Sequence, residues 1–325
     1  MLDISVDYMG IELDSPFMAA SSGYTADIEK IVALARSGVG AIVLKSLFEE
    51  QINNEAGFLE SQSAEYPENA DFLQRYVTDY SVGRYAELIQ VVKRKIGIPV
   101  IASINCFTCG SWTAFAKEVE RAGADALELN IYSMPLSEWE SSLEIEDSYR
   151  AIVKEVSEGI NIPVAVKIGE NFTNLSAFVS SIKGYGACAA VLFNRFYRPD
   201  ISLRSLKIVP ANPFSCKSEY FKELRWIAIL SSLVRNFDFS ASTGVHDSNS
   251  AIKLMLAGAK TVQLCSVLYQ QGPFVVSTFI EGLKRFMKEK GFASVSDFCG
   301  VLNYANIEHP QMFERVQFLK TAAKY

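Results

Sequence analysis

The sequence predicts a (β/α)8 barrel, a closed cylinder of eight parallel strands with a helix after each strand. Eight apolar strand patterns alternate with eight helical patterns along the 325 residues. The strand patterns are almost continuously apolar, as expected for a parallel sheet covered on both faces. One pattern also recurs, in which a helix ends at a glycine and an apolar strand follows and ends at a polar residue. A doubly wound open sheet is the competing fold, but it needs a G-x-G-x-x-G turn after its first strand and the sequence has none.

The recurring pattern and the apolar runs place each element in order. The pattern covers residues 37–45, 122–130, 186–194 and 257–265. Two further strands begin at Pro99 and Pro163, because proline is tolerated at a strand start. The expected strands are residues 16–21, 41–46, 99–104, 126–131, 163–168, 189–195, 237–243 and 261–266. The expected helices are residues 25–36, 84–96, 112–122, 145–158, 173–183, 221–235, 247–257 and 273–290.

Three segments add to the minimal barrel. Residues 4–14 alternate around Met9-Gly10 and predict a hairpin that caps the barrel floor. Residues 47–83 and 196–220 follow the second and sixth strands, and residues 201–209 predict an extra hairpin. Both insertions emerge at the carboxyl end of the barrel, so we expect them to cover the site as lids. The chain contains no linker or low-complexity tract, so we expect one domain over residues 1–325.

Composition limits the function classes. The 31 basic and 37 acidic residues give a net charge of −6, which argues against nucleic-acid partners and an anionic membrane surface. The longest apolar stretches are far shorter than the roughly 20 residues of a membrane-spanning helix. The first residues carry acids where a signal peptide needs basic residues, and the six cysteines are scattered, mostly in apolar runs. We therefore expect a cytoplasmic protein with free, buried thiols.

Polar residues gather where the expected strands end. In parallel strands these positions lie on the same face of the barrel, where barrel enzymes act. Buried polar groups are costly without partners, so a ring of them predicts a polar ligand, although each alone also fits a cap or turn. The ring consists of Ser21, Ser22, Gly23, Lys45, Ser46, Ser103, Asn105, Asn130, Lys167, Asn194, Ser242, Thr243, Gly244, Cys265 and Ser266.

Two lysines in this ring allow three interpretations. Lys45 ends a strand and Lys167 lies inside one. Each could extend its ammonium to the barrel rim, form a Schiff base with a substrate, or face an anionic cofactor. Two lysines around one pocket favour the third, because an electron-rich reduced cofactor needs positive charge nearby.

The ends of the last two strands predict a phosphate site, and no pattern in the sequence predicts a metal site. Thr243, Gly244 and Ser266 stand where barrels often bind phosphate through backbone N–H groups. His246 and His309 lack ligand-spaced companions, so no metal is expected. The pair Cys106-Phe-Thr-Cys109 is isolated, and chance spacing explains it best.

These residues resemble the dihydroorotate dehydrogenase family, flavin-mononucleotide (FMN) barrels of pyrimidine biosynthesis, from about Ile4 to Gly300. The matching motifs are Ser15-Pro-Phe-Met-Ala-Ala-Ser-Ser-Gly23, Val43-Leu-Lys-Ser46, Glu128-Leu-Asn-Ile131, Val164-Ala-Val-Lys167, Asn194, Ser242-Thr-Gly244, Cys265-Ser266 and Gln271-Gly-Pro273. The resemblance implies that FMN is held by Ala20, Ser21, Ser22, Gly23, Ser46, Ser103 and Asn105, and at its phosphate end by Ser242, Thr243, Gly244, Cys265 and Ser266. Lys45 and Lys167 would face its ring. It further implies that Asn130 contacts flavin and substrate, that Asn194 contacts substrate, and that Ser133 is the catalytic base, with Lys45 as a second catalytic residue.

The sequence departs from the family at three places. Met134 and Pro135 replace the Pro-Asn that follows the base. The Asn-x-Met-Gly turn is missing from residues 62–69, and the Gly-Gly-x-(Ser/Gly)-Gly segment is missing around residues 212–219. The flavin side of the site therefore matches better than the orotate side, and Arg195 or Asn69 is a candidate replacement contact to the substrate.

The sequence thus predicts an FMN-dependent dehydrogenase that converts dihydroorotate to orotate, or acts on another pyrimidine-like substrate. The resemblance also implies a homodimer. Two alternatives stay open: a phosphate-binding lyase or aldolase that uses Lys167 or Lys45, and a flavin-binding relative without this activity.

Overall fold

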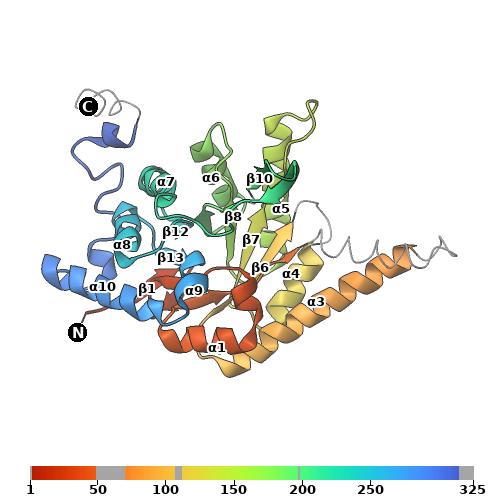
Figure 1. The fold of residues 1–325 in the computed structure, drawn as a ribbon, viewed down its shortest axis with the longest axis horizontal. Helices are drawn as coiled ribbons and strands as arrows, with labels where there is room; N and C mark the ends of the chain where they lie inside the picture. The colour runs from red at the N-terminus through yellow and green to blue at the C-terminus, as the bar shows by residue number, and fades with distance from the viewer. Residues whose placement is uncertain (1, 49–69, 107–111, 197, 315–325) are drawn as a thin grey trace.

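The computed structural model describes residues 2–48, 70–106, 112–196 and 198–314, without the side chains of residues 70–79 and 106. At its centre eight parallel strands form a closed barrel with helices around it (Figure 1). The barrel strands are β3 (Phe17–Ala19), β4 (Ala41–Val43), β6 (Val100–Cys106), β7 (Ala126–Ile131), β8 (Val164–Ile168), β9 (Ala189–Leu192), β12 (Asp238–Ser242) and β13 (Thr261–Leu264). Strand β4 pairs with β3 on one side and with β6 on the other, which closes the cylinder. The predicted (β/α)8 barrel is confirmed, and the open sheet is excluded.

Helices follow the strands in the predicted order. They are α1 (Ile28–Ser37), α3 (Ala70–Lys95), α4 (Trp112–Arg121), α5 (Ser142–Gly159), α6 (Leu175–Gly184), α7 (Tyr220–Leu233), α8 (Ser248–Ala257), α9 (Ser266–Gln271) and α10 (Val275–Lys290), with 3-10 turns at Gly23–Ala26, Val295–Asp297 and Pro310–Phe313. Asp27 caps α1 by accepting from the N–H groups of Glu29 and Lys30. Gly38 ends the same helix at φ 96°, a left-handed conformation that favours glycine. This explains why a glycine stands at the helix end in the recurring pattern.

The barrel floor is closed by the amino-terminal hairpin, as predicted. Strands β1 (Val6–Tyr8) and β2 (Ile11–Leu13) pair in antiparallel fashion. Tyr8 and Leu13 are buried against small interior residues, including Ala126 and Ala165. The Met9 N–H donates to Asp238 at 2.8 Å and fastens the turn to β12. Because this end is filled with side chains, a ligand has access from the other end, where the strands finish.

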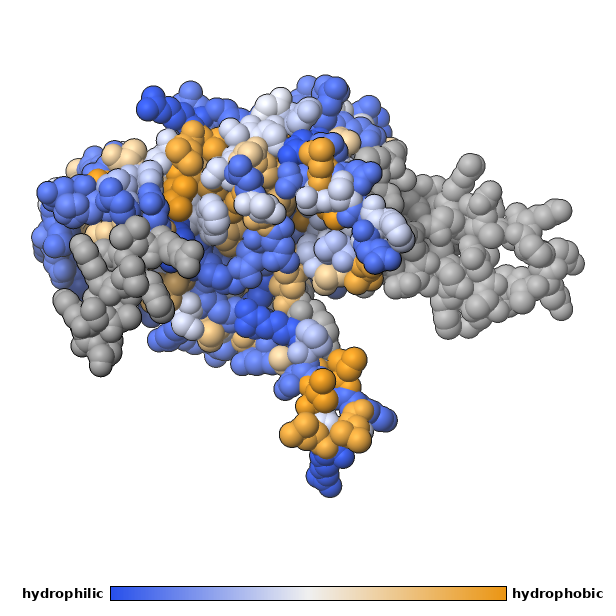
Figure 2. All heavy atoms as spheres, turned by 90° about the horizontal axis from the view of Figure 1, so that it is seen from above, coloured by the Kyte–Doolittle hydropathy of each residue, from blue (hydrophilic) through white to orange (hydrophobic). Residues whose placement is uncertain are grey.

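The insertion after β9 contains the predicted extra hairpin, β10 (Pro199–Ser202) with β11 (Lys207–Pro210). Figure 2 shows it standing off the body, with apolar side chains near its end. Those side chains are exposed by 64–87 %: Ile201, Leu203, Leu206 and Ile208. The hairpin therefore does not cover the strand ends, and the part of the insertion that reaches them comes after it.

The insertion after β4 differs from the expectation. Leu47–Phe48 forms the short strand β5 beside β6, and α3 begins at Ala70 instead of residue 84. The prediction started this helix after Gly83, whereas the helix runs through it, since one interior glycine costs only about 1 kcal/mol. The remainder of the predicted lid, residues 49–69, lies outside the described residues.

The expectations of no membrane-spanning helix and of buried cysteines both concern features that the structure describes. In the described ranges, no helix is both long and apolar enough to cross a membrane. Cys188, Cys216, Cys265 and Cys299 are free, but Cys188 and Cys216 are exposed and the other two are partly buried. The expectation of buried thiols is wrong for the exposed pair, because both stand in connecting segments outside the apolar strands.

Candidate active site

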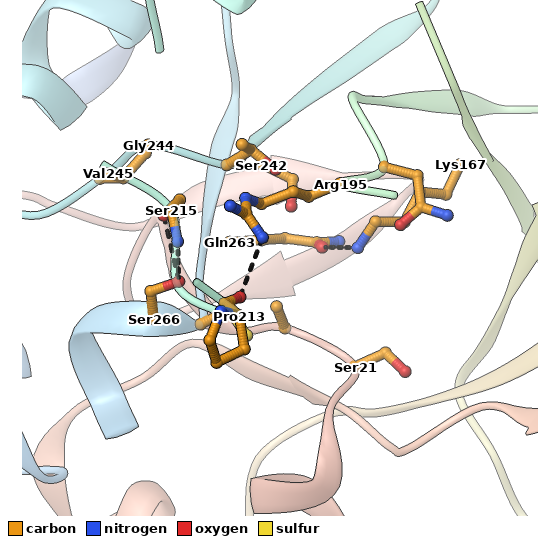
Figure 3. Close-up of a pocket in the computed structure, with 14 residues that line it drawn as sticks. Ser21, Lys167, Arg195, Pro213, Ser215, Ser242, Gly244, Val245, Gln263 and Ser266 are labelled. Carbon is orange, nitrogen blue, oxygen red and sulfur yellow. Dashed lines mark hydrogen bonds between the residues drawn. The ribbon is translucent and has the colours of Figure 1, made fainter. Parts of the chain in front are cut away.

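A pocket of about 160 Å³ opens at the carboxyl ends of the barrel strands. Figure 3 shows that its lining residues come from several different segments that meet around one cavity. They are Ala20, Ser21, Lys167, Asn194, Arg195, Pro213, Ser215, Ser242, Thr243, Gly244, Val245, Gln263, Cys265 and Ser266. Ten of these fourteen belong to the predicted site, and eight of the fifteen positions of the predicted ring line this one cavity.

A chain of hydroxyls joins the ends of three strands. The Oγ of Ser46 lies 3.0 Å from that of Ser21 and 2.7 Å from that of Ser103. The Ser46 N–H also donates to Ser21 Oγ at 2.9 Å. The buried Tyr85 hydroxyl accepts from the Ser103 N–H at 2.9 Å, and burial raises the pKa of this tyrosine well above its ordinary value. This network fixes the turn after β3, where Ser21 lines the pocket.

Lys167 is the buried cation of the pocket. Its Nζ donates to Gln263 Oε1 at 3.0 Å and lies 3.6 Å from Glu128 Oε1. The Gln263 amide in turn donates to Glu128 Oε2 at 2.6 Å. All three side chains are buried, so each charge has the partner that burial demands. An ammonium held in this way provides a fixed positive charge, whereas Schiff-base chemistry needs a neutral amine.

Two amides meet on the other side of the pocket. Asn194 Nδ2 donates to Asn130 Oδ1 at 2.9 Å, although the two residues are 64 positions apart in the chain. Asn130 is buried at the end of β7, and Asn194 follows β9 and lines the pocket. A planar amide pair of this kind offers both donors and acceptors to a flat heterocycle.

Ser133 lies in an adjoining cleft. Its backbone N–H donates to the Tyr149 hydroxyl at 2.8 Å. It lines a second cavity of about 300 Å³ with Tyr132, Pro135 and Phe172 among others. The Tyr132 ring packs against the Phe196 ring at a tilt of 30°, with centroids 3.9 Å apart, which joins the Ser133 loop to the segment that carries Asn194. The predicted base is thus next to the amide side but is not among the residues that line the first pocket.

The ends of β12 and β13 form the predicted phosphate end. Thr243 Oγ1 donates to the Phe193 carbonyl at 3.1 Å. Gly244 has φ +76°, and a Cβ there would stand 2.3 Å from the Tyr220 N atom, so only glycine fits between this turn and α7. Ser266 opens α9 directly after Cys265, and burial raises the pKa of the Cys265 thiol. Close backbone approach and small hydroxyls suit an anionic group.

The comparison with protein families decides the class of enzyme. The family model described as dihydroorotate dehydrogenase matches residues 3–287. The chain belongs to the dihydroorotate dehydrogenase family. It is therefore an oxidoreductase of the dihydroorotate dehydrogenase type, acting on a CH–CH bond, in a family that depends on flavin.

Individual relatives share low sequence identity with this chain, but the similarity spans most of its length. The catalytic subunit of dihydroorotate dehydrogenase B (NAD(+)) from Thermoplasma acidophilum is 27% identical over 313 residues, 93% of this chain and 99% of the relative. The protein with the same description from Pyrococcus furiosus is 25% identical, over 92% of this chain and 99% of its own length. A subunit of the NAD-dependent dihydropyrimidine dehydrogenase of Escherichia coli is 24% identical, over 93% of this chain and 77% of its own length.

Several residues predicted from the dihydroorotate dehydrogenase resemblance stand near the pocket without lining it. Lys45 and Ser46 follow β4, Asn105 lies near the end of β6, and Ser22 and Gly23 form the turn after β3. Lys45 is half-buried, and its backbone N–H donates to the Thr25 carbonyl at 3.4 Å. The pair Cys106 and Cys109 cannot be compared, because residues 107–111 and the Cys106 side chain lie outside the described residues. Across the described part of the chain, no three acidic, histidine or cysteine side chains form a metal-binding group.

Arg195 differs most from its predicted place. It lines the pocket, but its Nε donates to Glu219 at 3.1 Å and its NH1 to the Pro213 carbonyl at 2.9 Å. These partners lie on the segment before α7, where Pro213 lines the pocket together with the predicted phosphate end.

Sequence reasoning missed Glu128, Gln263, Ser215 and His246. Glu128 and Gln263 are polar residues inside apolar strands, the same signal that identified Lys167, and it could have found them. Ser215 and His246 gave no such signal, because they stand in loops that only the fold brings together.

Proposed function

We propose that this chain binds FMN and oxidises dihydroorotate to orotate. One observation carries the proposal. The Lys167 ammonium, the Asn130–Asn194 amide pair and the predicted phosphate end surround one cavity at the carboxyl ends of the barrel strands, where barrel enzymes act. When bound, FMN supplies the hydride acceptor. The residues present fit such a cofactor, because the cationic side of the pocket suits an electron-rich ring and the Gly244 turn suits a phosphate.

The protein's own part in the reaction is to position and to move a proton. Asn130 and Asn194 orient the flat ring of the substrate through their amide groups. Ser133 takes the proton from the ring carbon next to the one that loses hydride. A serine hydroxyl is a weak base unless its proton is passed on, so we propose that water or a neighbouring group in the Ser133 cleft receives it.

The identity of the cofactor has a direct test. The purified protein should be yellow, and heat should release a single flavin that co-elutes with FMN on chromatography. A colourless protein that takes up no added FMN would contradict the proposal. Borohydride should trap no substrate on Lys167 or Lys45, whereas a trapped adduct on either would support the lyase or aldolase alternative.

Partners are proposed on two grounds. Relatives are described as subunits, so we propose that a partner protein accepts the electrons. The exposed apolar side chains of the β10–β11 hairpin support a homodimer, because exposed apolar surface of this kind marks protein contacts. Sedimentation should give twice the chain mass, and Leu203→Ser with Leu206→Ser should shift it to one chain mass. A wild-type monomer would contradict the homodimer.

A further inference from the structure

A chain of hydrogen bonds runs from His246 to the wall of the pocket. Ser215 donates its hydroxyl hydrogen to Ser266 Oγ at 3.1 Å, and its backbone N–H donates to the same atom at 3.0 Å. Ser215 Oγ also lies 3.0 Å from His246 Nε2. Because the Ser215 hydrogen is already used, the hydrogen between these two atoms must belong to His246.

The direction of these hydrogen bonds, from His246 through Ser215 to Ser266, leaves one unused donor at the Ser266 end. Ser266 Oγ accepts two hydrogen bonds from Ser215, so its own hydrogen is left for a third group. Ser266 lines the pocket and, like Ser215 and His246, is buried. Donors in series polarise one another, and the three residues therefore direct a strengthened O–H toward the cavity. A hydrogen-bond acceptor satisfies it, and an anionic oxygen does so most strongly.

Arg195 adds a charge at the same end. Its Nε and NH1 bonds and a third bond from NH2 to the Asn212 carbonyl at 3.2 Å use three of the five guanidinium hydrogens. Figure 3 shows the guanidinium reaching across the cavity toward Pro213. Glu219 holds it in place: burial by itself would raise the pKa of Glu219, but hydrogen bonds from Cys216 and Arg195 lower it. Arg195 lines the cavity, and none of the described residues that line it carries a carboxylate.

The position of these residues explains a departure from the family sequence. Residues 212–219 lack the Gly-Gly-x-(Ser/Gly)-Gly segment, which by the family resemblance would help to hold the flavin phosphate. Ser215 and the carbonyl partners of Arg195 lie within these residues. We propose that Arg195 and the His246–Ser215–Ser266 chain form a phosphate subsite that replaces this segment and recognises the phosphate of FMN. The proposal rests on the FMN binding proposed above. It moves Arg195 from the substrate side of the site to the cofactor side.

The test compares FMN with riboflavin, which lacks only the phosphate. The full chain, freed of flavin, is titrated with each while the quenching of flavin fluorescence is followed. The wild-type protein should prefer FMN by roughly 100-fold or more, because the bonds at stake are charge-assisted. Arg195→Gln should weaken FMN binding by roughly 10- to 100-fold and leave riboflavin binding unchanged. Ser215→Ala should weaken FMN binding by roughly 3- to 30-fold. Inorganic phosphate should compete with FMN on the wild type.

Arg198→Gln is the matched control. Arg198 also donates to Glu219 Oε2, at 2.9 Å, but it is half exposed and does not line the pocket. This variant should bind FMN as the wild type does, and circular dichroism checks that each variant is folded. If Arg195→Gln does not fold, Ser215→Ala and phosphate competition decide the question.

The outcomes separate this inference from the proposed function. A wild type that binds neither flavin contradicts the FMN proposal itself. A wild type that binds both flavins equally, or an Arg195→Gln protein that loses both equally, overturns the phosphate subsite while FMN binding stands. An Arg195→Gln protein that keeps its FMN affinity but fails to react with dihydroorotate would return Arg195 to the substrate side.

Discussion

Lys167 and Glu128 form a buried ion pair inside the barrel, with Nζ 3.6 Å from Oε1 and Gln263 bonded to both. Strands β7 and β8 are neighbours, so the register of the sheet puts the two side chains on the same interior face. A buried pair of this kind adds little stability by itself, because desolvation offsets the attraction. We infer that it is present for its charge, which lines the pocket through Lys167.

The two members of the pair should shift the potential of the bound flavin in opposite directions. Lys167→Met removes a positive charge that favours the electron-rich reduced ring, so the midpoint potential should fall by roughly 30–60 mV. Glu128→Gln leaves the ammonium uncompensated, so the potential should rise by a similar amount. Reductive titration with a reference dye measures both. Equal potentials in wild type and both variants would show that the pair does not act on the cofactor.

Ser133→Ala should slow the reductive half-reaction by roughly 10²- to 10⁴-fold, the usual contribution of a general base. Flavin occupancy should not change, because Ser133 does not line the first pocket. Ser137→Ala is the control, since Ser137 is exposed on the same loop. Stopped-flow mixing with dihydroorotate gives both rates. If the two variants react equally fast, Ser133 is not the base.

Gly244→Ala should lower the free energy of unfolding by about 2–5 kcal/mol, because it combines a left-handed backbone with a clash. The new Cβ would stand 2.3 Å from the Tyr220 N atom. Gly10→Ala is the control: Gly10 has the same φ of +76° but nothing within 4 Å of its Cβ position. It should cost only about 1–2 kcal/mol. Urea unfolding compares the two, and equal losses would mean that the close approach to α7 carries no weight.

Glu223 should make the protein less stable as the pH rises. This carboxyl lies in the first turn of α7, and burial raises its pKa to about 8. The unfolded chain loses this proton near pH 4.5, whereas the folded chain keeps it to about pH 8. Between these values the folded state binds more protons, so its stability falls with pH, by at most about 1.4 kcal/mol per unit. Glu223→Gln should flatten this dependence in urea unfolding at pH 5 to 8. An unchanged profile would place the pKa of Glu223 in its ordinary range.

The barrel could be predicted because its cause is local in the sequence. Apolar strands, glycine helix ends and polar strand ends repeat with a fixed spacing, and the same spacing brought Ser21, Lys167, Asn194 and Ser266 to one pocket. The predicted range of helix α3 is too short. Taken alone, Gly83 suggests a helix end, but the helical turns on both sides of it keep the helix continuous.

The partners within the site were not predictable in this way. The bond between Asn130 and Asn194 spans 64 positions, and the Ser215–His246 contact spans 31. Loop residues follow no periodic pattern, so the neighbouring sequence does not predict which loop side chains will be in contact. Arg195 shows the consequence: its neighbour Asn194 suggested a substrate contact, but its partners lie on a different loop.

Anaerobic mixing of the FMN-loaded protein with dihydroorotate shows whether this barrel uses a bound flavin to oxidise that substrate, with the visible flavin absorption as the signal. We expect dihydroorotate to bleach this absorption and orotate to form in equal amount. If millimolar dihydroorotate leaves the flavin oxidised while another dihydropyrimidine bleaches it, the substrate is a different one. If no such compound bleaches it, the barrel is not a flavin-dependent dehydrogenase of this type.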